Sequence, residues 1–204
     1  MENWRPISLG NVDAKIMSKV LATRIKNVLP DIIYHNHRYI GETVRSIFDL
    51  MDFTLKENIP GLMIFIDFHK AFDSVEWNYS VTCLGAFRFG PDFIRWVKTL
   101  YKNIQSCVIN NGLTTGYFAL ERGERQADPS SPYLFVVVVE TLAIAIRQNT
   151  AIKGISIGKE ETKLLQYADD MTAILSDRDW ARALFNPLNV FRKMSGLKIN
   201  TSKT

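Results

Sequence analysis

Cysteine and histidine are scarce in this chain of 204 residues, which contains two cysteines and three histidines. Cys83 and Cys107 belong to no Cys-x-x-Cys or Cys/His cluster. Their isolation argues against a zinc site and favours two reduced thiols in an intracellular protein. The first residues contain no apolar segment of the kind that begins a secretory signal.

A long hydrophobic run is also missing. The longest one, 133–146, includes Glu140 and Thr141, and it is shorter than the ~20 residues that a membrane span needs. It predicts a buried helix, and we expect no membrane partner. The sequence contains no internal repeat, low-complexity tract or flexible linker. A net charge of +4 is compatible with a polyanionic partner without requiring one.

The spacing of apolar residues predicts strands mixed with helices, which is an α+β arrangement. One helix is expected over 14–29, ended by Pro30. Lys15, Lys19 and Lys26 share one face of this helix. That face is either exposed to solvent or in contact with a nucleic-acid backbone. The other expected helices are 42–56, 74–87 with a capping box at 73–76, 91–101, 131–149, and 179–195 with Pro187 inside it and Gly196 after it. A buried strand is expected over 61–68, a final strand over 197–199, and hairpins over 107–120 with an Asn111-Gly112 turn, over 154–162 and over 164–175.

Asp67 follows the apolar residues of the predicted strand 61–68. An ionised carboxylate is costly to desolvate there, so Asp67 lies at the open end of the strand or beside a cation such as Mg²⁺. Many strands end in aspartate, and this residue alone does not identify a site.

Asp169 and Asp170 form an adjacent acidic pair at the tip of the predicted hairpin 164–175. Aspartate favours turns, so a good turn former is the simpler explanation. Adjacent like charges repel, however, and a divalent cation removes that repulsion, with Mg²⁺ suited to hard oxygen ligands. Asp67 and Asp169 together could hold two ions about 4 Å apart, the arrangement of two-metal phosphoryl transfer.

Five stretches of the chain follow one another in a specific order and spacing: Asn3–Leu9, Phe65–Val75, Arg125–Phe135, Tyr167–Asp170 and Gly196–Asn200. Together they resemble the reverse transcriptases of non-LTR (LINE-type) retrotransposons, and the resemblance covers essentially the whole chain. It implies a right-hand polymerase with an antiparallel palm sheet packed on helices. Residues 1–60 would be part of the fingers and residues 61–204 the palm, with a fingers-derived insert around 88–125 and no thumb.

The resemblance also assigns site residues. Asp67 and Asp169 match the principal metal ligands, and Asp170 matches the second acid of the same motif. The remaining matches bind the nucleotide: Arg5 at the triphosphate, Phe72 as a steric gate against a 2′-hydroxyl, Gln126 near the nucleotide and template, and Lys203, with Lys198 as its alternative, beside the pyrophosphate. A core phenylalanine and a surface lysine are the plainer explanations for Phe72 and Lys203.

The implied activity is RNA-directed DNA polymerisation, with two Mg²⁺ ions (or Mn²⁺), an RNA template, a DNA primer and dNTPs. Two other functions are weighed against it. One is a catalytically inactive retrotransposon remnant that at most binds nucleic acid. The other is a viral RNA-dependent RNA polymerase palm or a nucleotide cyclase, against which Phe72 and the Tyr-Ala-Asp-Asp stretch 167–170 argue.

Four departures from the family pattern bear on that choice. Ala127 replaces the usual glycine, Ser130 replaces the usual leucine, and a Gln-x-Gly-aromatic stretch is missing between residues 34 and 40. The fourth is that no thumb follows Thr204. We therefore expect a truncated or decayed copy, acting in the cytoplasm or nucleus if it is expressed.

Overall fold

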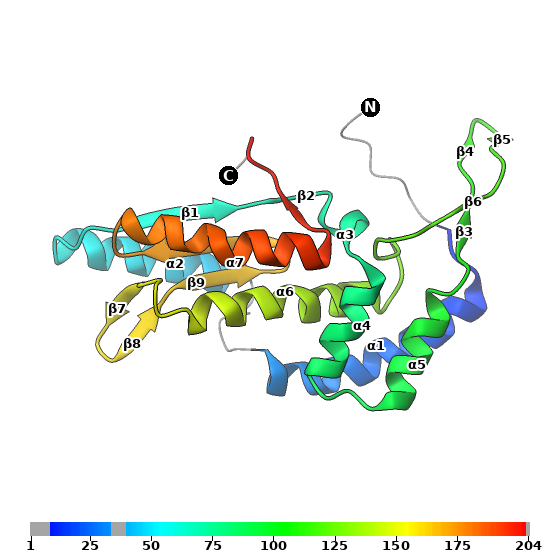
Figure 1. Cartoon of the computed structure of the whole chain (residues 1–204), viewed down its shortest axis with the longest axis horizontal. Helices are drawn as coiled ribbons and strands as arrows, with labels where there is room; N and C mark the ends of the chain where they lie inside the picture. Colours follow the sequence, from blue (N-terminus) through cyan, green and yellow to red (C-terminus); the bar gives the residue numbers. More distant parts are fainter. Residues whose placement is uncertain (1–8, 34–39, 203–204) are drawn as a thin grey trace.

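A small antiparallel sheet lies at the centre of the fold, which we describe from a computed structural model for residues 9–33 and 40–202 (Figure 1). Its strands are β1 (Leu62–Ile66), β10 (Asp170–Leu175) and β9 (Leu164–Tyr167), in the order β1-β10-β9. The pairing runs from Leu62 opposite Leu175 to Ile66 opposite Met171. The predicted strand over 61–68 and the predicted hairpin over 164–175 are thus confirmed, and both belong to one sheet.

Helices cover both faces of this sheet. On one face, β1 and β10 pack against α6 (Ser131–Gln148) and α7 (Asp179–Ser195), which together contribute eleven buried side chains to the main hydrophobic core. On the other face, Met63 and Ile174 pack against Leu50 of α2 (Ile40–Lys56). Because neighbouring residues of a strand point to opposite faces, both faces of β1 need apolar side chains. This explains why its sequence is almost continuously apolar.

α6 is the long apolar helix that the run 133–146 predicts. Its length and composition would allow it to cross a membrane, but 56% of it is buried within the protein. It also carries Glu140, which is buried and paired with Arg147 of the same helix. The core helix of a protein can have the same length and composition as a membrane span. Because α6 packs against α4, α7 and the sheet, we interpret it as a core helix.

Three further helices complete this layer: α1 (Val12–Ile32) and α4 (Trp77–Ala86) pack against α6, and α5 (Pro91–Leu100) packs against α1 and α4. The prediction that Pro30 ends α1 is wrong, because the helix continues to Ile32. A proline removes its own N–H donor and crowds the carbonyl four residues earlier, but only two helical residues follow Pro30. On the expected lysine face of α1, Lys19 and Lys26 are exposed.

The predicted helix 74–87 is two helices, α3 (Ala71–Ser74) and α4, separated by the extended residues Val75 and Glu76. The predicted capping box is also wrong, since Glu76 is the N-cap of α4 and no side chain caps it. Tertiary hydrogen bonds explain the break. The Glu76 amide donates to the Ser195 carbonyl (2.9 Å), and the Gly123 amide donates to the Val75 carbonyl (2.8 Å).

Four short hairpin or strand pairs complete the fold. β3 (Gln105–Ser106) pairs with β6 (Phe118–Ala119), and between them β4 (Ile109–Asn110) pairs with β5 (Leu113–Thr114). Asn111 and Gly112 form the predicted turn, both with positive φ as a type I′ turn requires, and this hairpin projects from the body of the protein (Figure 1). β7 (Ile155–Ile157) pairs with β8 (Glu160–Thr162), and β11 (Lys198–Ile199) pairs with β2 (Phe68–His69).

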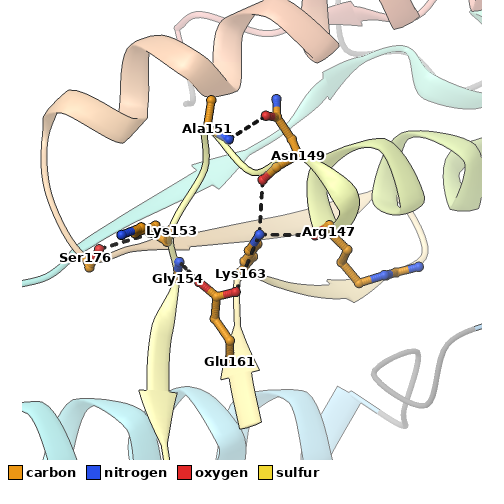
Figure 2. A network of polar contacts seen from close by, with 8 residues as sticks. All are labelled: Arg147, Asn149, Ala151, Lys153, Gly154, Glu161, Lys163 and Ser176. Carbon is orange, nitrogen blue, oxygen red and sulfur yellow. Dashed lines mark hydrogen bonds and ion pairs between the residues drawn. The ribbon is translucent and has the colours of Figure 1, made fainter.

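Lys163 ties the β7–β8 hairpin to the end of α6 (Figure 2). Its ammonium donates to the carbonyls of Arg147 and Asn149, both at 3.1 Å, and lies 3.5 Å from the Glu161 carboxylate. Glu161 in turn accepts from the Gly154 amide at 2.8 Å. A cation at a helix C-terminus satisfies carbonyls that have no partner within the helix. This network therefore stabilises the end of the sheet that lies away from Asp67.

Candidate active site

Asp67 and Asp170 come from distant parts of the chain and meet at one end of the sheet. Ile66 is paired with Met171, so the next position of each strand sets Asp67 opposite Asp170. The same alternation puts both acids on the face of the Phe65–Thr172 pair. Directly opposed residues of antiparallel strands have Cβ atoms about 5 Å apart. Two carboxylates at that spacing form a local concentration of negative charge.

Asp169 lies in the turn that precedes β10. Asp170 pairs with Tyr167 across the hairpin, so Ala168 and Asp169 are the two turn residues, with Ala168 at φ +50°. The expectation that the Asp169-Asp170 pair occupies the tip is therefore only half right, since Asp170 is already the first residue of β10. The strand register sets Asp170, not Asp169, opposite Asp67. Asp169 remains one residue away from that pair.

Asp67 is held by Asn200, which follows β11. The Asn200 side-chain amide donates to a carboxylate oxygen of Asp67 at 2.8 Å, and its backbone amide donates to the Asp67 carbonyl at 2.8 Å. These bonds continue the β2–β11 pairing by one residue. Asp67 thus stands between two strands, with Asp170 on one side and Asn200 on the other.

The donor set at this end of the sheet fits a hard divalent cation. Asp67, Asp169 and Asp170 offer carboxylate oxygens, and Mg²⁺ takes one or two carboxylates and completes its shell with water and substrate phosphates. Over residues 9–33 and 40–202, no three His, Cys, Asp or Glu side chains are gathered closely enough to form a metal centre by themselves. Substrate oxygens would therefore have to supply part of the coordination.

Phe72 of α3 follows the Asp67 strand end by five residues. Its ring stacks on Phe135 of α6, with centroids 4.4 Å apart and an interplanar angle of 27°, and it is half-buried. Its carbonyl accepts a hydrogen bond from the Glu124 amide at 2.6 Å. The ring is therefore packed on the core while part of its surface remains accessible. This arrangement is compatible both with a steric gate and with a core phenylalanine.

Gln126 and Ala127 form the centre of a turn beside α3. The Asp128 amide donates to the Arg125 carbonyl at 3.3 Å, and Ala127 has φ +60°. A turn with positive φ at its third residue normally has glycine or asparagine there. The Gln126 side chain donates to the Asp73 carboxylate at 3.3 Å, which connects the turn to α3. The departure at Ala127 therefore falls where an alanine is strained.

Ser130, the second departure, belongs to a buried polar cluster. Its hydroxyl donates to the Asp128 carboxylate at 2.7 Å, and the Ser18 hydroxyl of α1 donates to the same carboxylate oxygen at 2.6 Å. The Ser130 amide is also within 3.1 Å of this oxygen. The leucine that the family pattern predicts at this position could not make these bonds, so Ser130 attaches the start of α6 by hydrogen bonds.

Glu124 is a buried acid that the sequence did not single out. It is 3% exposed and accepts hydrogen bonds from the Tyr101 hydroxyl and, at 3.4 Å, from the Ser80 hydroxyl. Burial raises the pKa of Glu124 to about 7 against the opposing effect of these two bonds. No local pattern could have found it, because 121–125 contains four charged residues and such a segment predicts exposure to solvent.

Arg125 fixes the start of the same loop. Its guanidinium donates to the Leu100 carbonyl at 2.6 Å and lies 5.9 Å from the centre of the Tyr101 ring. Glu124 and Arg125 therefore both attach the loop to the end of α5. The turn that carries Gln126 follows directly.

Several predicted site features lie outside the described residues, namely Arg5, Lys203 and the junction at 34–39, where the sequence predicts that a family element is missing. Lys198, the alternative to Lys203, is exposed on β11 and pairs with His69.

Comparison with known proteins decides the family. The sequence model of the family described as "Reverse transcriptase (RNA-dependent DNA polymerase)" matches residues 1–204. The chain belongs to the reverse transcriptase family. This reverse transcriptase domain is 30% identical, over its full length, to an uncharacterised 149 kDa protein of transposon TX1 from Xenopus laevis. It is 28% identical over 99% of its length to the Pol polyprotein of a type-1 R2 element from Popillia japonica.

These relatives are proteins of non-LTR retrotransposons, which confirms the predicted resemblance. The reverse transcriptase domain spans 16% of the TX1 protein and 29% of the R2 polyprotein. Among solved structures, telomerase from Candida tropicalis in complex with a TWJ fragment of telomeric RNA has a TM-score of 0.65 at 15% identity. That match covers 92% of this domain and 32% of the telomerase chain. It confirms the α+β right-hand polymerase fold.

Proposed function

We propose that this domain catalyses RNA-directed DNA polymerisation, joining dNTPs to the 3′-hydroxyl of a primer on an RNA template. The observation that carries the proposal is the register of the β1–β10 ladder, which ends at the pair Ile66 and Met171, next to Asp67 on one strand and Asp170 on the other. Family membership supports the reaction class. The likeness to a telomerase bound to a telomeric RNA fragment agrees with an RNA template.

The acids have a distinct role in this proposal. Asp67, Asp169 and Asp170 would hold one or two divalent cations, Mg²⁺ or Mn²⁺, at the primer end and the triphosphate. Such ions lower the pKa of the attacking hydroxyl and neutralise charge on the leaving pyrophosphate. What the chain itself contributes is position, because Asp67 and Asp170 lie at strand ends and Asp169 lies in the two-residue turn before β10.

The remaining residues would bind and select the nucleotide. The Phe72 ring, stacked on Phe135, would fill the space that a 2′-hydroxyl needs and so favour dNTPs over rNTPs. Gln126 would contact the nucleotide and template from its turn, with Asp73 holding its amide. We assign Arg5 to the triphosphate and Lys203 to the pyrophosphate on the family match alone.

We also propose the division into partial fingers over 1–60 and palm over 61–204, with a fingers-derived insert around 88–125. The projecting β4–β5 hairpin lies within that insert (Figure 1). A projecting hairpin of this kind would cover the substrate rather than complete the hydrophobic core.

Primer extension tests the proposal. The purified chain is incubated with a labelled DNA primer on an RNA template, dNTPs, and Mg²⁺ or Mn²⁺ over a range of concentrations. We expect weak extension, increased by Ala127→Gly and reduced at least about 100-fold by Asp67→Asn or Asp170→Asn, the scale of losing one electrostatic catalytic group. Asp52→Asn, at an exposed aspartate of α2, is the matched control and should change nothing.

A nucleic-acid-binding remnant without catalysis is the second candidate, and Ala127 at φ +60° is the observation that favours it. Fluorescence anisotropy with a labelled RNA–DNA hybrid at two salt concentrations measures binding separately from chemistry. Salt-sensitive binding by an Ala127→Gly chain that extends no primer at any metal concentration would replace the polymerase proposal with this one.

A further inference from the structure

Asn200 makes two contacts to one acid of the candidate site. Its backbone amide and its side-chain amide both donate to Asp67, at 2.8 Å each, across a separation of 133 residues. The backbone bond goes to the Asp67 carbonyl and extends the β2–β11 pairing. The side-chain bond goes to the carboxylate. The first contact would hold the strands together without the second.

Ser202 determines which way the Asn200 amide points. The Ser202 hydroxyl donates to the Asn200 side-chain oxygen at 2.6 Å, and the Ser202 backbone amide is 3.3 Å from the same oxygen. An asparagine side chain has one accepting end and one donating end. With the accepting end engaged by Ser202, the donating end is directed at Asp67.

We infer that Asn200 is a positioning residue, which holds the Asp67 carboxylate in one orientation toward a divalent cation. This inference rests on the proposed function. An aspartate side chain can rotate about two bonds. A hydrogen bond that orients the carboxylate in advance therefore increases its affinity for a metal ion. Partners that orient metal-binding groups typically change metal affinity or activity 10- to 100-fold when they are removed.

Three variants test the inference. Asn200→Ala removes the side-chain bond and keeps the backbone one, Ser202→Ala releases the amide without removing it, and Asn189→Ala, at an exposed asparagine of α7, is the control. Equilibrium Mn²⁺ binding is measured from the electron paramagnetic resonance signal of free Mn²⁺, which does not depend on activity. The Mg²⁺ concentration for half-maximal primer extension and the thermal unfolding midpoint are measured alongside.

We expect Asn200→Ala to weaken Mn²⁺ binding and to raise the half-maximal Mg²⁺ concentration, each by about 10- to 100-fold. Ser202→Ala should shift both in the same direction by a smaller factor, and Asn189→Ala should shift neither. A residue with only a structural role would lower the unfolding midpoint but leave the metal affinity of the folded protein unchanged. If Asn200→Ala does not fold, Ser202→Ala carries the test.

The outcomes separate this inference from the proposed function. If the wild-type chain extends primers and Asn200→Ala binds Mn²⁺ as tightly as the wild type, the inference is overturned while the polymerase proposal stands. If the wild-type chain binds Mn²⁺ and extends nothing, the polymerase proposal is lost, and a weakened affinity in Asn200→Ala still supports the role of Asn200. If the wild-type chain binds no Mn²⁺ and extends no primer at any metal concentration, both are wrong.

Discussion

Replacing Glu124 with glutamine should make the stability of the protein less dependent on pH. Glu124 is enclosed by α4 and α5 and accepts hydrogen bonds from Tyr101 and Ser80. Burial raises its pKa from 4.5 to about 7, the nearby Asp128 adds to the increase, and Arg125 opposes it. Above neutral pH the folded protein must therefore keep an ionised carboxylate in its interior.

The size of the effect follows from the two pKa values. The folded state binds the Glu124 proton more tightly than the unfolded state, so this group's stabilising contribution is complete below pH 4.5. It is lost as the pH rises to about 7 and changes no further above that. At about 1.4 kcal/mol per pH unit, the loss is roughly 3 kcal/mol. Glutamine has no proton to lose, and its amide can still accept from Tyr101 and donate to Ser80.

Urea unfolding of the wild-type and Glu124→Gln proteins at several values between pH 4.5 and pH 8 checks this. The difference in unfolding free energy, variant minus wild type, should rise by roughly 3 kcal/mol across that range, because the contributions of all other titrating groups cancel. Glu121→Gln, at an exposed glutamate of the same segment, should give a nearly constant difference. A difference that stays flat for Glu124→Gln would refute the argument that burial perturbs this carboxyl.

Three other outcomes are expected. Ala127→Gly should stabilise the protein by about 0.5–1 kcal/mol in urea unfolding, because an L-residue at positive φ is strained; an equal or lower stability would show that this turn carries no strain. Gly154→Ala should lower the free energy of unfolding by about 1–3 kcal/mol in the same assay, since an added Cβ would lie 2.1 Å from the Thr162 carbonyl oxygen. Gly85→Ala in α4, where an added Cβ would meet no atom within 4 Å, is the control and should not lower it. In thiol labelling with a disulfide reagent, Cys107 should react well before the buried Cys83, whose pKa burial raises to about 11; equal rates under native conditions would contradict the packing of α4.

Local sequence patterns were enough to predict most of the elements. The apolar run before Asp67 predicts β1, the Asn111-Gly112 turn predicts the projecting hairpin, and Gly196 predicts the end of α7, where it has φ +79°. Each of these depends on residues that are neighbours in the sequence. The spacing of the five family stretches added the fold, since it combines many such local patterns. Its assignment of the three acids as metal ligands stays a prediction.

What the sequence could not predict depends on contacts between distant residues. The break at Val75 and Glu76 follows from hydrogen bonds to Ser195 and Gly123, which overrule a reasonable helix-capping pattern. Glu124 lies in a charged segment and becomes buried only because Tyr101 and Ser80 surround it. The contact of Asn200 with Asp67 joins two strand ends that no short-range pattern connects.

The strand order β1-β10-β9 also affects how the protein is made. β1 leaves the ribosome early, but β10, its neighbour in the central sheet, is not synthesised until the chain has passed residue 175. During that interval the apolar edge Leu62–Ile66 is available to other chains, and such edges promote aggregation. We therefore expect chains ending before residue 164 to aggregate and to bind a hydrophobic dye more than the chain of residues 1–204 does. Truncated chains as soluble as the chain of residues 1–204 would contradict this. A host cell expressing the protein would depend on chaperones mainly between the synthesis of β1 and that of β10.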